Sequence, residues 1–222
     1  MIRVAIYLLI FVQLITVNSF SRSLDIESII KNVQSKYEKI ENFHAEFDQE
    51  AEVNSLKTVQ KAHGEVWFKK PGKMRWNYFK PSKDEIVSDG INIWYYNQLE
   101  NQVMESKIAS LTSENNSTTL LTGLGNLDNI FDSRFSTMGA TDDKGNYQID
   151  LTPKDQEAEE FNKVTIVVDR ETKLVNKFFI YDLFGNVTTI KLKNLELNKK
   201  IKDSVFKFKV PKGAELLQVP TA

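Results

Sequence analysis

The order of hydrophobic and polar positions along the chain predicts one helix that leads into a sheet. Residues 24–40 place apolar side chains at helical spacing, and Ser23 or Asp25 is available as the N-cap. From Phe43 to about Val53 the period changes, because apolar residues now alternate with polar ones. This alternation is typical of a strand that buries one face.

Short turn signals divide the rest of the chain into further strands. Pro71-Gly72 and Asp89-Gly90 supply the backbone angles that tight turns need, so each pair predicts a hairpin. Further strands are expected at residues 65–70, 73–79, 85–88, 91–97, 102–105, 147–151, 164–169, 174–181, 187–197 and 205–210. We therefore expect about ten antiparallel strands in meander order.

Residues 106–131 interrupt this series of strands. Leu120, Leu121 and Leu124 fall at helical offsets, but glycines break the pattern, so we expect short helical pieces. The predicted fold class is α+β, mainly β. A sheet of this size curls, and helices laid across its concave side would enclose a space.

Large side chains occur on both faces of the first predicted hairpins. Trp67 stands between Val66 and Phe68, and Trp94 stands between Ile93 and Tyr95. An ordinary β core explains any one of these residues. Large side chains on both faces indicate either a sheet that is covered on its convex side or a sheet that lines a concave apolar cavity.

The first residues have the composition of an export signal. One cation, Arg3, precedes an apolar run over residues 4–17, and small or polar residues follow. This run is shorter than the roughly 20 residues that a spanning helix needs. We expect a cleaved signal peptide over residues 1–21 and a single domain over residues 22–222; the alternative is an uncleaved membrane anchor.

Composition argues against several classes of function. With 29 basic and 30 acidic residues the net charge is -1, which does not favour a nucleic-acid surface. The chain has no cysteine, so it offers no thiol nucleophile and no thiolate metal ligand. Its two histidines, His44 and His63, lack metal-ligand spacing, and its paired carboxylates lie near turn signals. We expect no catalytic residue, no metal and no cofactor.

An ordered set of motifs resembles one family of carrier proteins. The set comprises Phe43-His44-Ala45, Phe47, Gln49, Gly64, Trp67, Pro71-Gly72, Met74, Trp76, Tyr78, Pro81, Val87-Ser88-Asp89-Gly90, Ile93-Trp94-Tyr95-Tyr96-Asn97, Leu151-Thr152-Pro153, Phe206, Phe208, Val210-Pro211 and Gly213. Its order and spacing are similar to those of the LolA family, periplasmic carriers that take lipoproteins from the inner to the outer membrane. The resemblance covers about residues 24–216.

The resemblance implies an incomplete, strongly curved antiparallel β-barrel with a helical lid over an apolar cavity. Acyl chains would enter this cavity, whose expected lining is Phe43, Phe47, Val66, Phe68, Met74, Trp76, Trp94, Leu120, Leu121 and Leu124. A basic residue before the proline of the first hairpin helps to hold the lid shut in the family, and Lys70 occupies this position. Lysine lacks the rigid donor fork of arginine, so we expect a less firmly held lid.

The resemblance also implies a pathway. A soluble periplasmic monomer would receive lipoproteins from an inner-membrane lipoprotein-releasing ABC transporter and deliver them to the outer-membrane receptor LolB. LolB shares the fold but is anchored through a lipid-modified cysteine, so a chain without cysteine favours the carrier. The alternative is a binding module of the same half-barrel type that senses lipids or lipoproteins.

Overall fold

The structure is a computed structural model that describes residues 25–108, 124–155 and 161–218. Its first element, helix α1, spans Ile26–Glu38, and the Asp25 carboxylate caps it by accepting a hydrogen bond from the Glu27 backbone N–H at 3.2 Å. The buried residues of α1 are Ile29, Ile30, Val33 and Tyr37. The predicted amphipathic helix is confirmed.

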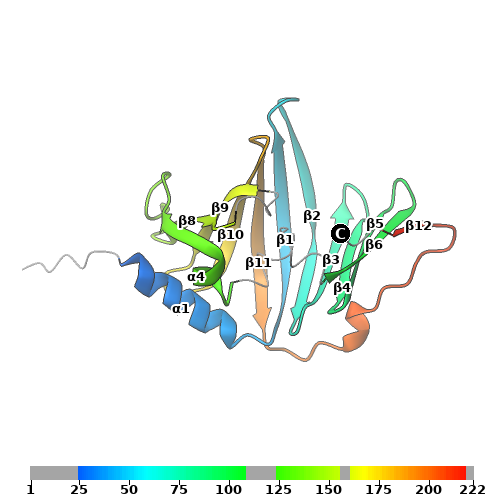
Figure 1. The fold of residues 1–222 in the computed structure, drawn as a ribbon, viewed down its shortest axis with the longest axis horizontal. Coiled ribbons are helices and arrows are strands. Elements are labelled where there is room, and N and C mark those ends of the chain that lie inside the picture. Colours follow the sequence, from blue (N-terminus) through cyan, green and yellow to red (C-terminus); the bar gives the residue numbers. More distant parts are fainter. Residues whose placement is uncertain (1–24, 109–123, 156–160, 219–222) are drawn as a thin grey trace, which may run out of the picture.

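Twelve described strands form one open, curved sheet (Figure 1). The strands are β1 (Asn42–Val53), β2 (Thr58–Lys69), β3 (Lys73–Lys80), β4 (Glu85–Asp89), β5 (Asn92–Asn97), β6 (Gln102–Lys107), β7 (Phe131–Phe135), β8 (Tyr147–Pro153), β9 (Phe161–Val168), β10 (Val175–Asp182), β11 (Val187–Leu197) and β12 (Glu215–Gln218). Two short helical elements complete the described fold, α4 (Leu127–Ile130) and η1 (Asp203–Phe206). The mainly β class is confirmed.

The order of strands differs from the single meander that the sequence predicts. The sheet runs β12-β6-β5-β4-β3-β2-β1-β11-β10-β9-β8-β7, so two antiparallel meanders meet where β1 pairs with β11. The chain therefore passes from β6, near one edge, to β7 at the opposite edge (Figure 1). β12 then returns to β6 and pairs with it in parallel.

The local turn predictions agree well with the structure, and some strand predictions do not. Pro71-Gly72 joins β2 to β3, and Asp89-Gly90 joins β4 to β5, as expected. The strand expected at residues 205–210 is wrong, because this segment forms the end of η1 and an irregular stretch after it. Strands β7 and β12 were not expected at all.

The core lies between the inner face of the sheet and α1. Inward side chains of β1–β3 and β7–β11 form one contiguous buried cluster together with Ile30 and Val33 of α1. The helix is fixed to the sheet by Tyr37, whose hydroxyl accepts a hydrogen bond from the Val175 backbone N–H at 3.0 Å. Burial raises the pKa of Tyr37 far above its ordinary value, so this phenol stays neutral.

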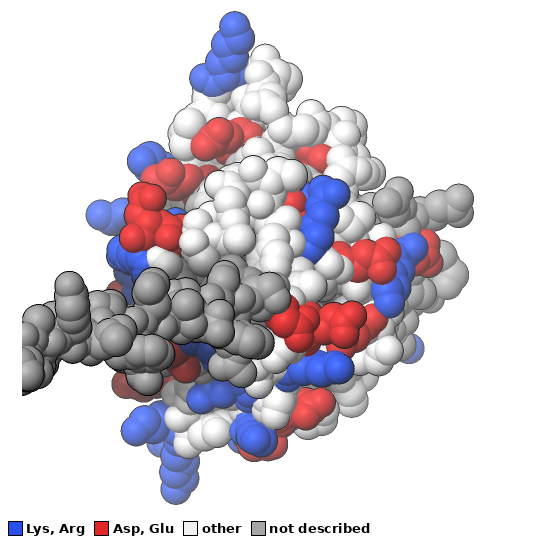
Figure 2. Space-filling model, turned by 90° about the vertical axis from the view of Figure 1, so that its left-hand side faces the viewer, with Lys and Arg blue, Asp and Glu red and all other residues white. Residues whose placement is uncertain are grey.

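The surface shown in Figure 2 mixes charges of both signs. Acidic and basic side chains are interspersed there with uncharged residues, and no broad area of one sign forms. Across the described ranges the structure has no helix whose length and apolar character would let it cross a membrane.

Candidate functional site

The inner face of β1–β3 carries an apolar wall made of two cross-strand rows. Antiparallel pairing places residues in register, and side chains of paired residues point to the same face. The rows are Phe43–Phe68–Met74 and Ala45–Val66–Trp76. We call these six residues, together with Phe47 of the next row, the inner wall. It contains six of the ten residues that the sequence predicts as cavity lining.

The aromatic rings of the inner wall pack with defined geometry. Phe43 and Phe68 stack with ring centroids 5.3 Å apart, and Phe47 meets Trp76 edge-on at 4.7 Å. The indole N–H of Trp76 donates to the Met74 sulfur at 3.1 Å, which satisfies a donor that would otherwise be unpaired in this apolar setting. The wall is therefore preorganised and presents hydrocarbon, ring faces and a thioether.

Tyr78 closes one end of the inner wall with a polar group. Its ring meets Phe47 edge-on at 5.1 Å, and its hydroxyl donates to Gln49 Oε1 at 3.1 Å. Burial raises the pKa of Tyr78 to about 12, with the nearby Tyr95 and Asp84 adding to the shift. Tyr78 therefore acts as a neutral hydrogen-bonding group and not as an acid or base near neutral pH.

The inner wall is covered in this structure. Each of its side chains is at most 7% exposed, and all belong to the cluster that includes α1. Leu124, which is also expected in the cavity, is fully buried in the same cluster. Leu120 and Leu121 lie outside the described residues. The described residues of the wall are thus buried, and the expected cavity and lid remain predictions.

Lys70 reaches the carboxyl end of α1. Its Nζ donates to the backbone carbonyl oxygens of Tyr37 at 3.1 Å and Glu38 at 2.8 Å. These carbonyls lie at the negative end of the helix dipole, where a cation is stabilising. Gly125 packs at the same place, since a Cβ there would lie 3.8 Å from the Glu38 backbone nitrogen. Lys70 thus holds the end of α1 next to the segment that follows Leu124.

A second link between helical elements was not predicted from the sequence. Gln34 of α1 and Asp128 of α4 exchange hydrogen bonds: Gln34 Nε2 donates to Asp128 Oδ2 at 3.0 Å, and the Asp128 backbone N–H donates to Gln34 Oε1 at 2.7 Å. Lys154 Nζ adds a bond to the Asp128 carbonyl oxygen at 2.6 Å. Both α1 and α4 are therefore fastened at the β7–β8 edge of the sheet.

The prediction that Trp94 lines the same cavity is wrong. Trp94 pairs with Val87, and Val87 pairs with Arg75, so these side chains project from the convex face, opposite to Met74 and Trp76. There Trp94 stacks on Phe208 of the C-terminal segment, with centroids 5.7 Å apart. Its neighbours Ile93 and Tyr95 point to the inner face in its place, beside Ser88 and Ile86.

The C-terminal segment, residues 199–214, explains why both faces of the first hairpins carry large side chains. Phe206 of this segment is buried, and Arg75 Nη1 donates to the Val205 carbonyl oxygen at 3.1 Å. Asp203 pairs with Lys69 at 2.7 Å and Lys73 at 3.2 Å. The sheet is thus covered on its convex side here, which is one of the two arrangements that the sequence left open.

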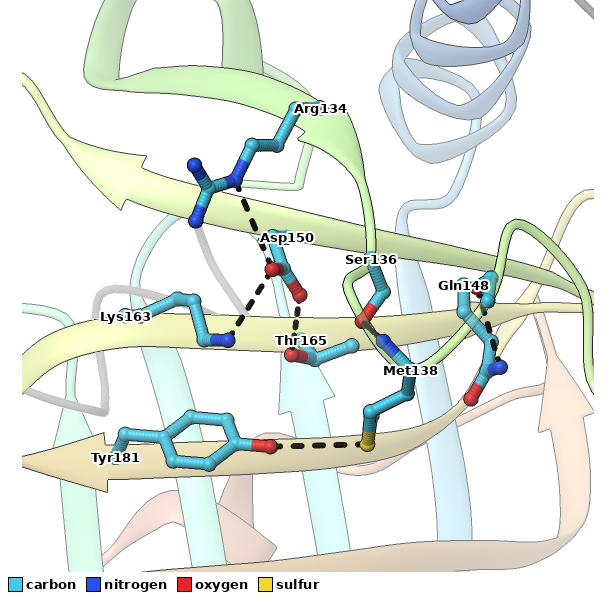
Figure 3. Close-up of polar contacts among 9 residues, drawn as sticks. Arg134, Ser136, Met138, Gln148, Asp150, Lys163, Thr165 and Tyr181 are labelled. Carbon is cyan, nitrogen blue, oxygen red and sulfur yellow. Dashed lines mark hydrogen bonds and ion pairs between the residues drawn. The ribbon is translucent and has the colours of Figure 1, made fainter. Parts of the chain in front are cut away.

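A buried carboxylate on the convex side of the other half of the sheet was also missed (Figure 3). Asp150 has a fully buried side chain and accepts hydrogen bonds from Thr165 Oγ1 at 2.7 Å and Lys163 Nζ at 3.1 Å. Burial alone would raise the pKa of Asp150, but the hydrogen bonds from Thr165, Lys163 and Ser136 lower it below its ordinary value. The side chain is a satisfied structural ion and not a perturbed catalytic acid.

The described residues offer no metal centre. Over residues 25–108, 124–155 and 161–218, histidine, aspartate and glutamate side chains form no group of three that could hold a metal ion.

Comparison with known proteins gives consistent results. The family model described as "Outer membrane lipoprotein carrier protein LolA" matches residues 38–209. The chain is 30% identical over 189 residues to an outer-membrane lipoprotein carrier protein of Nitrosospira multiformis, covering 85% of this chain and 87% of that protein. A carrier protein of the same name from Methylobacillus flagellatus is 32% identical over 163 residues, covering 72% of this chain and 74% of that protein.

A likeness of fold also exists among solved structures. The crystal structure of an uncharacterized conserved protein from Thermus thermophilus aligns with a TM-score of 0.55 at 14% sequence identity. The alignment covers 87% of this chain and 98% of that one.

Proposed function

Since the chain belongs to the LolA family of outer membrane lipoprotein carrier proteins, we propose that its inner wall holds the acyl chains of a lipoprotein. The observation that supports this proposal most strongly is the pair of cross-strand rows, Phe43–Phe68–Met74 and Ala45–Val66–Trp76, on one face of the sheet. The only side-chain N–H in these rows is the Trp76 indole, and Met74 satisfies it. The wall therefore suits hydrocarbon.

The energetics require direct handover of the cargo. Burying one methylene group gains about 0.8 kcal/mol, so a dozen on one acyl chain contribute on the order of 10 kcal/mol before costs. Cargo held this strongly does not leave for water at a useful rate. We propose that it passes directly into a receptor that binds the lipid more tightly.

The covered state of the inner wall corresponds to the empty carrier in this proposal. Leu124, which is buried in the same cluster as the wall, covers it in the absence of cargo together with Leu120 and Leu121 of the proposed helical lid. Because one apolar covering is exchanged for another, opening costs little. Met74 assists, since its flexible thioether adapts to acyl chains of different lengths. Lys70 holds the lid side of α1 and acts as the latch.

The proposed route begins with export. Residues 1–21 direct the chain to the periplasm as a signal peptide, and residues 22–222 remain there as a single-domain, soluble monomer. An inner-membrane lipoprotein-releasing ABC transporter supplies the energy to load cargo, because extraction of a lipid from a membrane is unfavourable. The outer-membrane receptor LolB accepts the cargo. No catalytic step by the carrier is involved.

Mass spectrometry of the material that co-purifies with the periplasmic protein tests this function. Triacylated lipoproteins are the expected cargo, and a preparation that carries only free fatty acid or phospholipid would contradict it. Met74→Asn should lower the yield of cargo, because it places an amide on the inner wall. Met138→Asn is the matched control, since Met138 is 49% exposed and lies outside the wall; it should leave the yield unchanged.

A further inference from the structure

A polar groove of about 500 Å³ lies apart from the inner wall. It is lined by Asp142, Lys144, Asn146, Asp169, Arg170, Glu171, Asn176, Lys177, Lys191 and Leu192. Two turns form its sides, one before β8 at residues 142–146 and one between β9 and β10 at residues 169–171. Four of the lining side chains are cationic and three are anionic.

The groove opens on the convex side of the sheet. Lys191 pairs with Asp48, the residue next to Phe47, and successive residues of a strand point to opposite faces. Since Phe47 belongs to the inner wall, Lys191 projects from the other face, as does its cross-strand partner Lys177. A ligand in this groove would therefore not compete with an acyl chain.

The acidic groups of the groove are largely committed to their own turns. Asp142 Oδ1 accepts the backbone N–H groups of Lys144 and Asn146, both at 2.9 Å. Asp169 Oδ1 accepts the N–H and hydroxyl groups of Thr172, both at 2.8 Å. Burial acts to raise the pKa of Asp142, but its hydrogen bonds and the nearby charge of Lys177 keep this pKa below its ordinary value. The hydrogen bonds from Thr172 keep the pKa of Asp169 below its ordinary value. Both carboxylates act as turn-forming acceptors.

The four cations are not ion-paired in the described part of the chain. The described ion pairs include none of Lys144, Arg170, Lys177 and Lys191. Arg170 lies over the Tyr147 ring at 5.5 Å and Lys177 over the Phe179 ring at 5.4 Å, contacts that hold these side chains without neutralising them. The groove therefore keeps cationic hydrogen-bond donors that are available to a ligand.

Lys177 and Lys191 stand directly opposite each other on β10 and β11. Like charges at such a position destabilise a sheet, and an anion that both ammonium groups share would relieve the repulsion. We propose that this groove binds a phosphate group, either as a free phosphate or as the headgroup of an anionic lipid. A phosphate suits it because lysine binds phosphate as a compact charge, and one phosphate offers oxygens to several donors at once.

Calorimetric titration with inorganic phosphate and pyrophosphate at low salt tests the free-phosphate source. Flotation with phosphatidylglycerol vesicles, compared with phosphatidylcholine vesicles, tests the headgroup source. The Lys177→Gln/Lys191→Gln variant is measured with whichever probe the wild-type protein binds. Its affinity for that probe should be about tenfold lower, since two exposed charge contacts are lost. It should unfold at no lower temperature than the wild type, because the opposed charges are gone.

The Lys207→Gln/Lys209→Gln variant is the matched control. It removes the same charge from two exposed lysines of the C-terminal segment and should bind as the wild type does. Binding of a soluble probe with loss in the groove variant supports a free phosphate, and binding of phosphatidylglycerol vesicles alone with the same loss supports a headgroup. The proposal is overturned if the wild-type protein binds neither probe, or if both double variants behave alike. Neither result bears on acyl-chain binding, which uses the opposite face.

Discussion

Gly64 on β2 lies directly opposite Phe47 on β1, and the Phe47 ring occupies the space that a side chain at position 64 would need. A Cβ at Gly64 would come within 2.8 Å of this ring and within 2.0 Å of the Asn77 carbonyl oxygen. The ring in turn meets Trp76 and Tyr78 edge-on. A missing side chain on one strand thus sets the position of three aromatic residues at the inner wall.

Gly64→Ala should therefore destabilise the protein. The added methyl group forces the Phe47 ring or strand β3 to move, and overpacking of this kind costs about 1–3 kcal/mol. Chemical denaturation should show a lower free energy of unfolding, whereas Gly125→Ala should change it little, because a Cβ there makes only ordinary contacts. Equal stability of the two variants would show that the packing around Phe47 is not as tight as described.

Lys70→Arg should retain cargo longer than the wild-type protein. Lys70 Nζ already donates to two carbonyl oxygens at the end of α1, and the guanidinium group adds donors in a fixed geometry. Lys70→Gln should shorten cargo retention. It removes a cation whose interaction with the carboxyl end of α1 is stabilising by about 0.3–1 kcal/mol. The rate of transfer of a fluorescent lipopeptide to acceptor vesicles measures both effects. Unchanged rates in both variants would exclude a latch role for Lys70.

Asp150 should make stability depend on acid pH. Its pKa in the folded protein lies below the ordinary value of 3.8, so its contribution is fully present above that value and is lost as pH falls through the lower, folded pKa. Asp150→Asn leaves Lys163 without its carboxylate and should cost about 1–3 kcal/mol at neutral pH. The variant should also lose part of the pH dependence of unfolding. Asp132→Asn, at an exposed position of the paired strand β7, is the control and should change neither the stability at neutral pH nor the pH dependence of unfolding.

Trp76→Ala and Trp94→Ala should have separable effects. Trp76 is part of the inner wall, so its truncation should weaken the binding of a fluorescent fatty-acyl probe. Trp94 stacks on Phe208, so its truncation should loosen the C-terminal segment and speed amide exchange in β12, which follows that segment. If Trp94→Ala weakens acyl binding as much as Trp76→Ala does, the assignment of the two faces is wrong.

Local signals in the sequence were sufficient for the helix, the turns and most strand positions. Asp25 caps α1, and the Pro71-Gly72 and Asp89-Gly90 turns join the predicted pairs of strands, because each signal acts through its own backbone. The pairing of β1 with β11 had no such signal. It joins segments far apart in the chain, and alternation shows which face of a strand is buried without specifying its partner.

The residues of the candidate site were likewise predictable only where a local signal existed. Period-two alternation placed Phe43, Ala45 and Phe47 on one face, because polar residues stand between them, and the structure buries all three side chains. It failed at Ile93-Trp94-Tyr95-Tyr96, where every side chain is large and the C-terminal segment covers one side. Asp150 was missed for a related reason: a carboxylate between apolar residues resembles an exposed strand position, and tertiary packing buries it.

Neighbouring residues on β2 point to opposite faces of the sheet, so they can show whether lipoprotein acyl chains lie on the inner face. A photo-crosslinking amino acid is placed at Phe68, on the inner wall, or at Trp67, on the convex face beside His44. Both proteins are irradiated in periplasm that contains a lipoprotein with alkyne-tagged acyl chains. We expect an acyl crosslink from position 68 and none from position 67. Crosslinking from position 67 alone, or equally from both positions, would contradict this expectation.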